Sequence, residues 1–577
     1  MSGIFFNGYI RLNHLPMYHL IKHGAGLLFF GLISVFTSAQ EPATPPQGQI
    51  HGNFNVLWQQ YNEDTLIGAT VPPAKTGFNS FGNLTYSYGN FTAGLRFESY
   101  LDAVNGYPGR FKKSGIGSRF AQYKTHLIDI TVGNFYEQFG SGLTLRTYWE
   151  PNLGIDNALD GMRVVLTPYS GITLKGIYGT QRVDFDGRLI NTESLVRGGD
   201  GDFLLNDIFK SLAEMKTKIS LGASFVSKFQ VGDVIEKGEL VLEVPQNVSV
   251  YGGRFQLNRG GISLYGEYVE KINDPSFDNK YIYKNGRSIL INTGYSRKGF
   301  GINLDAKFVD NMSFRSDRDL SLLDVPINFV PAITKQHTYN LAATLYPYAT
   351  VLNGESGITA EFLYAFKKET LIGGKYGTNL SINFSAVNGL DTTQYTGNDG
   401  LVYGYETNSV LFGPEKFIRD LNIEVKKKFT KKLAATYTFY YLEFNTNVNQ
   451  VTPEFYGMLY ATIHVLDVNY KINPRNSFRA ELQNLLTDQD RKDWATVVME
   501  YTFSPHWTFG LIDQYNYGND KEEDRIHYLF GTVGYNHEGS RLTLGYGKRR
   551  EGIFCIGGVC RQVPASNGLE ITITSTF

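Results

Sequence analysis

The sequence predicts an all-β fold, a transmembrane antiparallel β-barrel of about 24 strands within a range of roughly 20 to 26. Three observations predict it. Apolar and polar residues alternate in short segments from about residue 50 to the end, and the chain starts with a secretory signal. It is also rich in tyrosine, phenylalanine and glycine, at 38, 40 and 62 of 577 residues. A soluble sandwich alternates as well, but the signal and the uniform texture favour a membrane barrel.

The start of the chain has the layout of a signal peptide. An apolar run at residues 26–36 follows Lys22 and His23, and the small residues 37–39 come after it. This run is too short for a transmembrane helix, which needs about 20 residues. We expect a signal peptide at residues 1–39, with a possible true start at Met17. A short periplasmic leader at 40–50 and a barrel at 51–577 would follow.

Individual strands show one apolar and one polar face. The clearest hairpin turns at Gly89-Asn90, where Gly supplies the positive φ of a tight type II′ turn. On its second strand Arg96 and Glu98 share the face opposite Leu95 and Phe97. Charged residues in mid-strand, opposite a lipid-like face, predict a wet interior.

Connections between the strands alternate in length, with short turns and longer polar loops. Short turns are expected near residues 124–125, 170–171, 298–299, 430–432, 473–476, 504–506 and 538–539, and longer polar loops at 311–324 and 389–413. Outer-membrane barrels have short periplasmic turns and long outer loops. The up–down order slips at 229–246 and again at 348–390, so either region hides an extra strand or an inward fold.

The last ten residues, 568–577, form an alternating strand that ends on Phe577. Such a strand resembles the closing strand of bacterial outer-membrane barrels. The resemblance implies that Phe577 acts as a barrel-closing signal, that the barrel assembly machinery is a partner, and that the protein lies among outer-membrane lipid in a Gram-negative-type bacterium.

The stretch 132–163 holds the densest set of charged residues and bends. We predict that it folds inward and forms a pore constriction, because facing carboxylates and guanidinium groups set selectivity in channels. An ordinary surface loop or a structural plug would also account for it. The stretch is similar to the strand–loop–strand of carbohydrate and alginate porins in its return at residues 159–163 (LDGMR), although Asn134 replaces the Arg of that family. The predicted constriction residues are Glu137, Arg146, Glu150, Asp156, Asn157 and Asp160.

The two cysteines, Cys555 and Cys560, lie in the motif CIGGVC. In a secreted chain such a pair predicts a disulfide, and the two glycines between the cysteines let the chain reverse; free thiols are the alternative. Together with Arg561, Pro564, the closing strand and the motif GNFYEQFGSGL, this segment resembles an uncharacterised family of Bacteroidota outer-membrane barrels. That resemblance implies a fold and a location.

No catalytic motif is found in the sequence. There is no H-E-x-x-H pair and no G-x-S-x-G turn, and residues 199–202 (GDGD) lack EF-hand spacing. We expect no enzyme, cofactor or metal, and a formal net charge of −1 gives no reason to expect a nucleic acid partner.

The sequence therefore favours a porin-like passive channel for small polar solutes. The alternative is a non-conducting barrel that anchors or scaffolds a secretion or uptake complex, with loops 311–324 and 389–413 as binding surfaces. Since the strand pattern starts near His51, we do not expect an N-terminal plug.

Overall fold

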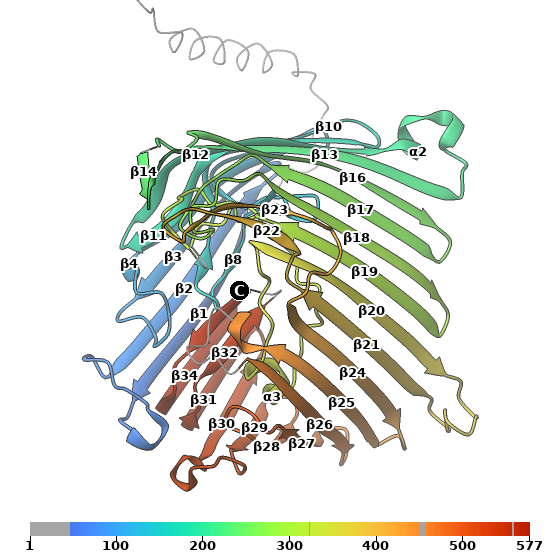
Figure 1. The fold of residues 1–577 in the computed structure, drawn as a ribbon. Helices are drawn as coiled ribbons and strands as arrows, with labels where there is room; N and C mark the ends of the chain where they lie inside the picture. The colour runs from blue at the N-terminus through green and yellow to red at the C-terminus, as the bar shows by residue number, and fades with distance from the viewer. Residues whose placement is uncertain (1–46, 233, 322–323, 449–456, 557–558) are drawn as a thin grey trace, which may run out of the picture. The chain divides into compact units, whose positions relative to one another are not determined.

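The structure is a closed barrel of 24 antiparallel strands, which confirms the predicted fold class (Figure 1). The computed structural model describes residues 47–232, 234–321, 324–448, 457–556 and 559–577. Residues 48–577 form one compact unit. The predicted signal peptide and residues 40–46 of the predicted leader lie outside the described residues. None of the described helices has the length and apolar character to cross a membrane.

Each strand of the wall pairs with its neighbours along the chain, and the last strand pairs with the first. The wall consists of β1 (Gln49–Tyr61), β2 (Thr76–Tyr88), β3 (Phe91–Tyr100), β4 (Phe111–Lys124), β5 (Ile128–Phe135), β10 (Leu159–Tyr169), β11 (Ile172–Asp186), β12 (Leu189–Leu204), β13 (Thr217–Phe229), β16 (Asn247–Arg259), β17 (Ile262–Lys271), β18 (Gly286–Arg297), β19 (Phe300–Asp310), β20 (Gly354–Phe366), β21 (Thr378–Asn388), β24 (Lys416–Lys428), β25 (Leu433–Asn445), β26 (Met458–Lys471), β27 (Asn476–Leu486), β28 (Trp494–Phe503), β29 (Trp507–Tyr515), β30 (His527–His537), β31 (Ser540–Arg549) and β34 (Ser566–Thr576).

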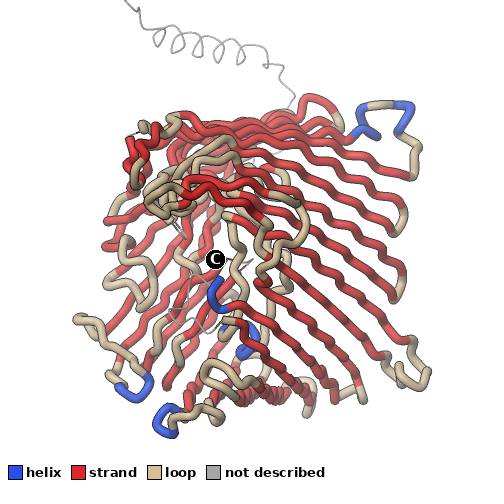
Figure 2. The backbone as a smooth tube through the Cα atoms, viewed as in Figure 1, coloured by secondary structure: helices blue, strands red, loops and turns tan. Residues whose placement is uncertain are grey.

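Strands make up most of the described chain, and short strands and helices lie in the connections between the wall strands (Figure 2). They are η1 (Thr65–Ile67), β6 (Gln138–Phe139), β7 (Leu145–Arg146), β8 (Trp149–Glu150), β9 (Ile155–Asp156), α2 (Leu205–Ile208), η2 (Lys210–Leu212), β14 (Val234–Lys237), β15 (Leu240–Glu243), α3 (Asn340–Thr344), β22 (Thr392–Thr396), β23 (Val402–Thr407), η3 (Thr446–Val448), η4 (Glu522–Asp524), β32 (Gly552–Ile556) and β33 (Val559–Val563).

The barrel closes where β34 joins β1. In this pairing Ile573 faces Val56 and Ile571 faces Trp58, so the apolar faces of both strands continue across the seam. Phe577 exchanges two backbone hydrogen bonds of 2.9 Å with Gly52. A side chain at residue 52 would collide with the ring of Phe577, so the glycine leaves room for it.

Most of the short turns gather at one end of the barrel and most of the long loops at the other, as the sequence predicts; the exceptions are the turn at 187–188 and the connections at 205–216 and 367–377. Gly89 has a φ of 56°, the positive value that the first hairpin requires. At the first parity slip, β14 and β15 form a separate hairpin outside the wall sheet. At the second, the wall gains β20 and β21, joined by a connection at 367–377.

The outer face of the wall is apolar and the inner face is polar. On β19 the side chain of Leu304 is exposed on the outside, while Asp305 on the other face accepts a hydrogen bond of 2.8 Å from Asn292 of β18. The two main clusters of buried apolar residues lie inside the barrel, between the wall and chain segments that enter the lumen. The core is therefore at the site where a channel would run.

Candidate functional site in the barrel lumen

Two segments enter the lumen from the long-loop end. The first inward segment, residues 136–158, leaves the wall after β5 and returns at β10. Its Phe139, Leu143 and Leu145 are fully buried against apolar side chains of the inner wall, such as Val226 and Val248. Packing of this kind holds the segment against the wall.

A cluster of four buried charges attaches the first inward segment to β3 and β11. Arg182 donates to Asp156 at 2.6 Å and to Glu98 at 2.7 Å, and Arg96 contacts the same two carboxylates. The four side chains are 1–5% exposed. Two positive and two negative groups balance, which is the condition for burying charge without a large desolvation penalty. Tyr136 adds a 2.8 Å hydrogen bond to Asp156.

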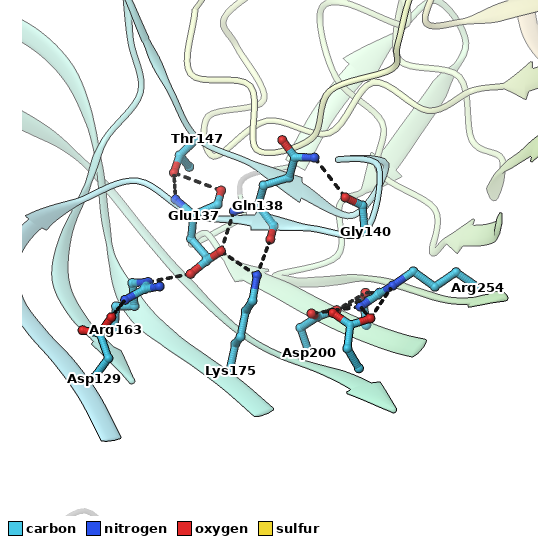
Figure 3. A network of polar contacts seen from close by, with 11 residues as sticks. Asp129, Glu137, Gln138, Gly140, Thr147, Arg163, Lys175, Asp200 and Arg254 are labelled. Carbon is cyan, nitrogen blue, oxygen red and sulfur yellow. Dashed lines mark hydrogen bonds and ion pairs between the residues drawn. The ribbon is translucent and has the colours of Figure 1, made fainter. Parts of the chain in front are cut away.

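A second network surrounds Glu137 (Figure 3). Its carboxylate accepts hydrogen bonds from Lys175 at 2.9 Å and from Arg163 at 2.5 Å, and Arg163 also pairs with Asp129 at 3.2 Å. Burial alone would raise the pKa of Glu137, but the hydrogen bond and charge of Lys175, with the contact to Arg163, hold the pKa below its usual value of 4.5. Glu137 is therefore an ionised anchor at neutral pH.

The acidic pair of the GDGD motif belongs to a third, neighbouring network (Figure 3). Arg254 of β16 donates to Asp200 at 2.8 Å and to Asp202 at 2.6 Å. The guanidinium of Arg254 neutralises both carboxylates, so no metal ion is needed between them. Across the described part of the chain, no group of three or more His, Cys, Asp or Glu side chains could hold a metal.

The other predicted constriction residues have different partners. The guanidinium of Arg146 stacks over Phe329 at 4.0 Å, and Asn157 donates to the carbonyl of Pro326 at 2.8 Å. Glu150 is half-buried and accepts from the backbone of Asn152, whereas Asp160 accepts from Arg119 at 3.2 Å. The structure therefore brings Glu137 and Asp156 to the wall and Arg146 and Asn157 to the second inward segment. Their role as a pore constriction stays a prediction.

The second inward segment, residues 311–353, connects β19 to β20 and is called the strap here. The expectation that 311–324 is an outer loop open to partners is wrong: Met312, Phe314 and Ser316 are at most 1% exposed. The apolar residues of the strap are irregularly spaced among polar ones, so no period marks them as buried. Some of the polar ones bond to other loops: Arg318 donates to the carbonyl of Pro245 at 2.9 Å, and Asn353 donates to the carbonyl of Asp278 at 2.8 Å.

The first half of the strap is anchored on β11 to β19. Met312, Phe314 and Ile327 join the apolar cluster that also holds the first inward segment. Ser316 donates to Gln181 of β11 at 2.6 Å. The two inward segments also contact each other, since Arg146 donates its backbone N–H to the carbonyl of Ile327 at 2.8 Å.

The second half is anchored on β24 to β30. Leu341 of α3 is fully buried in the other apolar cluster and donates its N–H to Gln483 of β27 at 2.9 Å. His337 contacts Asp420 of β24 at 2.6 Å, and Asn340 accepts from Gln514 of β29. Because β11 and β29 are almost half a circumference apart in the order of paired strands, the strap crosses the lumen.

Loops at the long-loop end reinforce the start of the strap. Asp310 accepts hydrogen bonds from Lys284 at 2.5 Å and from Tyr405 and Thr407 of β23 at 2.7 Å. The β22–β23 hairpin, within the loop predicted at 389–413, is thus tied to the 272–285 connection. Its Tyr395 remains exposed, so this hairpin still offers an outer surface.

Charged side chains of the wall near the seam are accessible, unlike the buried cluster around Arg182. Arg549 of β31 pairs with Glu570 of β34 at 2.6 Å, and their side chains are 42% and 18% exposed. A cavity of about 220 Å³ lies between this wall and α3, lined in part by Arg549 and Arg550. Burial lowers the pKa of Arg550 to about 10. Its Nε has no hydrogen-bond partner within the described structure.

A second cavity of about 420 Å³ lies between the strap and β16 to β21. Most of the residues that line it are polar, and they include Asn292, Asp305, Glu361 and Asn383 of the wall together with Lys335 of the strap. Lys335 and Glu361 are 3.7 Å apart. The lumen wall is therefore polar below the strap as well as near the seam.

The cysteines form a register pair in the β32–β33 hairpin, so Cys555 and Cys560 face each other across it. Their side chains lie outside the part of the chain that the structure describes. The disulfide stays a prediction.

These features define a large outer-membrane-like β-barrel whose lumen is crossed by its own loops. Residues 22–577 match a family described as a family of unknown function (DUF6029), and the chain belongs to that family. No curated protein matches the chain.

Among solved structures, the chain is similar to the translocation pore of the P pilus usher PapC, at 8% identity and a TM-score of 0.44, over 92% of this chain and 99% of that one. It is also similar to the siderophore receptor PirA from Pseudomonas aeruginosa, at 11% identity and a TM-score of 0.37, over 93% and 82%. A third similar structure is OccAB3 from Acinetobacter baumannii, at 9% identity and a TM-score of 0.35, over 92% and 99%.

Proposed function

We propose that this protein is an integral outer-membrane barrel through which small polar solutes diffuse passively, along the wall between β29 and β1. One observation carries the proposal: charged pairs in the lumen differ in access to water. Arg549 is 42% exposed on the seam wall, whereas Arg182 is 1% exposed beside the first inward segment. Charges that line a water-filled path set its selectivity, while buried pairs hold structure.

The strap limits the size of the solute in this proposal. It crosses the lumen between β11 and β29 and leaves the seam side with accessible polar groups, among them Lys548, Arg549 and Glu570. Positive and negative groups alternate there, which suits neutral or weakly charged polar solutes better than a strongly charged one. No cofactor or covalent chemistry is needed, and the partners are lipid, the barrel assembly machinery and the solute.

A non-conducting scaffold is the second candidate, and the filled long-loop half favours it. The strap, the first inward segment and the β22–β23 hairpin are joined by hydrogen bonds, and the hairpin exposes Tyr395 and Leu401 to a partner. In this case the barrel would anchor a secretion or uptake complex.

Single-channel recording in a planar bilayer separates the two candidates. For a channel we expect stable conductance steps. Under a salt gradient, Arg549→Gln should shift the reversal potential in the direction of greater cation selectivity, because the substitution leaves the charge of Glu570 unpaired on the path. Arg259→Gln is the matched control, since Arg259 is an exposed residue at the short-turn end of β16. A folded, heat-modifiable barrel without conductance would exclude the channel and favour the scaffold.

A further inference from the structure

Three adjacent connections at the short-turn end form a strongly basic surface. They join β20 to β21, β24 to β25 and β26 to β27, and β21 pairs with β24 as β25 does with β26. The same stretches, 366–377, 424–432 and 471–475, hold two acidic residues, Glu369 and Glu424. The exposed basic residues, called the basic rim here, are Lys367, Lys368, Lys375, Lys426, Lys428, Lys431, Lys432, Lys471 and Arg475.

The side chains of the basic rim have no carboxylate partner: none of the ion pairs among the described residues includes one of them. Lys432 instead donates to the carbonyl of Ile472 at 2.9 Å, and Lys428 lies 5.6 Å from the ring centre of Tyr376. Like charges in adjacent connections repel one another when no carboxylate pairs with them, so the arrangement favours an external anion.

Exposed apolar and aromatic side chains lie in the same connections and in the strands beside them. Leu371 is 99% exposed and Ile372 next to it is 54% exposed, both in the 367–377 connection, which reaches outward at the lower right of Figure 1. Phe429, Tyr437 and Tyr470 are also exposed. Aromatic girdles of membrane barrels mark the level of the lipid headgroups, and lysines there extend their ammonium groups toward the phosphates.

Another connection at the short-turn end carries mixed charges. The connection at 205–216 contains Asp207 and Glu214 beside Lys210 and Lys216, and Lys218 follows in β13. The excess of positive charge is therefore not shared by every connection at this end, although the exposed Arg297 and Lys298 extend it to the neighbouring turn between β18 and β19. The net charge of −1 does not show this local excess of positive charge, because it is summed over all residues of the chain.

We propose that the basic rim binds the phosphate headgroups of anionic phospholipids in the leaflet at the short-turn end. The proposal rests on the membrane location proposed above. The exposed Leu371 and Ile372 favour a lipid surface over an acidic protein, because apolar tips between lysines can enter the boundary between headgroups and acyl chains. Binding to this sector would fix the depth of the barrel and recruit anionic lipid around β20 to β26.

Native mass spectrometry of the full folded chain in detergent tests this, with phosphatidylglycerol and phosphatidylcholine of matched acyl chains as probes. The parent should retain phosphatidylglycerol about tenfold better than phosphatidylcholine, with the preference weakening as salt rises. The triple variant Lys368→Gln, Lys431→Gln and Lys432→Gln should bring the two lipids close to equal retention. The matched control, Lys210→Gln, Lys216→Gln and Lys218→Gln, should keep the parent's preference.

Equal retention of both lipids by the parent, or equal loss in both triple variants, would overturn the proposal. Inorganic phosphate that displaced the lipid more strongly than sodium chloride of equal ionic strength would indicate a free-phosphate site and also overturn it. Heat-modifiability and conductance, measured on the same samples, keep the two proposals apart. A conducting barrel without lipid preference would refute only the proposal that the basic rim binds anionic lipid. A non-conducting barrel with that preference would refute only the channel.

Discussion

Both inward segments pack apolar side chains against the inner wall, but the first also depends on buried ion pairs, whereas the strap is anchored on two sides of the barrel. The first inward segment is held on one side of the barrel, where Asp156 and Glu137 pair with cations of β3, β10 and β11. The strap is held at both ends, by apolar contacts around Phe314 on one side and Leu341 on the other.

This difference bears on which segment can move. A buried ion pair has strict geometry, and separating it exposes uncompensated charge in a region of low dielectric. Apolar contacts tolerate small shifts, and the strap bonds to the wall at scattered points such as Ser316–Gln181 and His337–Asp420. We therefore expect the first inward segment to be the more rigid of the two, and we expect removal of the strap, which crosses the lumen, to change the passage.

Removal of the strap should give the largest effect. Asp310 and Gly354 are register partners at the ends of β19 and β20, so a short Gly-rich turn can replace residues 311–353 without changing the wall. We expect a many-fold rise in single-channel conductance, because a segment that crosses the lumen is lost. Replacement of residues 389–415, whose flanking residues Asn388 and Lys416 also pair, is the control and should change conductance much less. Equal conductance in parent and strap-deleted barrel would show that the strap does not limit the path.

Breaking the charge cluster should give the next largest effect. Asp156→Asn leaves Arg96 and Arg182 with one carboxylate instead of two, and losing one member of a buried ion network costs about 3–5 kcal/mol. We expect that loss in the free energy of unfolding by urea, together with earlier proteolysis within 136–158. Lys492→Gln disrupts an exposed pair with Asp520 and should cost less than about 1 kcal/mol. If both variants behaved alike, the first inward segment would not depend on its charges.

A cavity in the strap's second anchor should cost somewhat less. Leu341→Ala removes a fully buried side chain from α3 and should lower the free energy of unfolding by about 3 kcal/mol. Because Leu341 carries no charge, this loss should be the same at pH 5 and pH 8. Leu371→Ala, at an exposed position, is the control and should stay within about 0.5 kcal/mol of the parent. A negligible effect of Leu341→Ala would mean that α3 is not an anchor.

The wall of the barrel could be predicted from the sequence because its signal is local. Each strand shows its two faces within ten or so residues, as Leu95 and Arg96 do on β3. Turns such as Gly89-Asn90 can be recognised from their residue types alone. The count of about 24 strands follows from adding such segments. The inward segments are different, since what buries them lies far away in the chain.

The first inward segment was visible because its charges and glycines are dense, but its partners were not. Nothing near Asp156 in the sequence points to Arg96 or Arg182, which only the closed wall brings to it. The strap was missed altogether. Met312 and Leu341 do not belong to a sustained periodic pattern. The strap that carries them is anchored by wall residues as distant in the sequence as Gln483 and Gln514. The basic rim escaped notice because net charge averages over the chain.

The smallest effect, and the sharpest contrast between the two segments, should come from pH. The pKa of Glu137 lies below its usual value of 4.5 in the folded protein because Lys175 and Arg163 stabilise the carboxylate. Its contribution is therefore fully present above the unfolded pKa and is lost as pH falls through the lowered folded pKa. Glu137→Gln should destabilise the barrel at pH 7, and the gap between parent and variant should narrow as pH falls below the usual pKa of 4.5 and close below the lowered folded pKa, whereas the loss caused by Leu341→Ala should persist there. A gap that stayed constant down to pH 3 would show that the Glu137 network contributes no ionic anchoring, and the two segments would then be held alike.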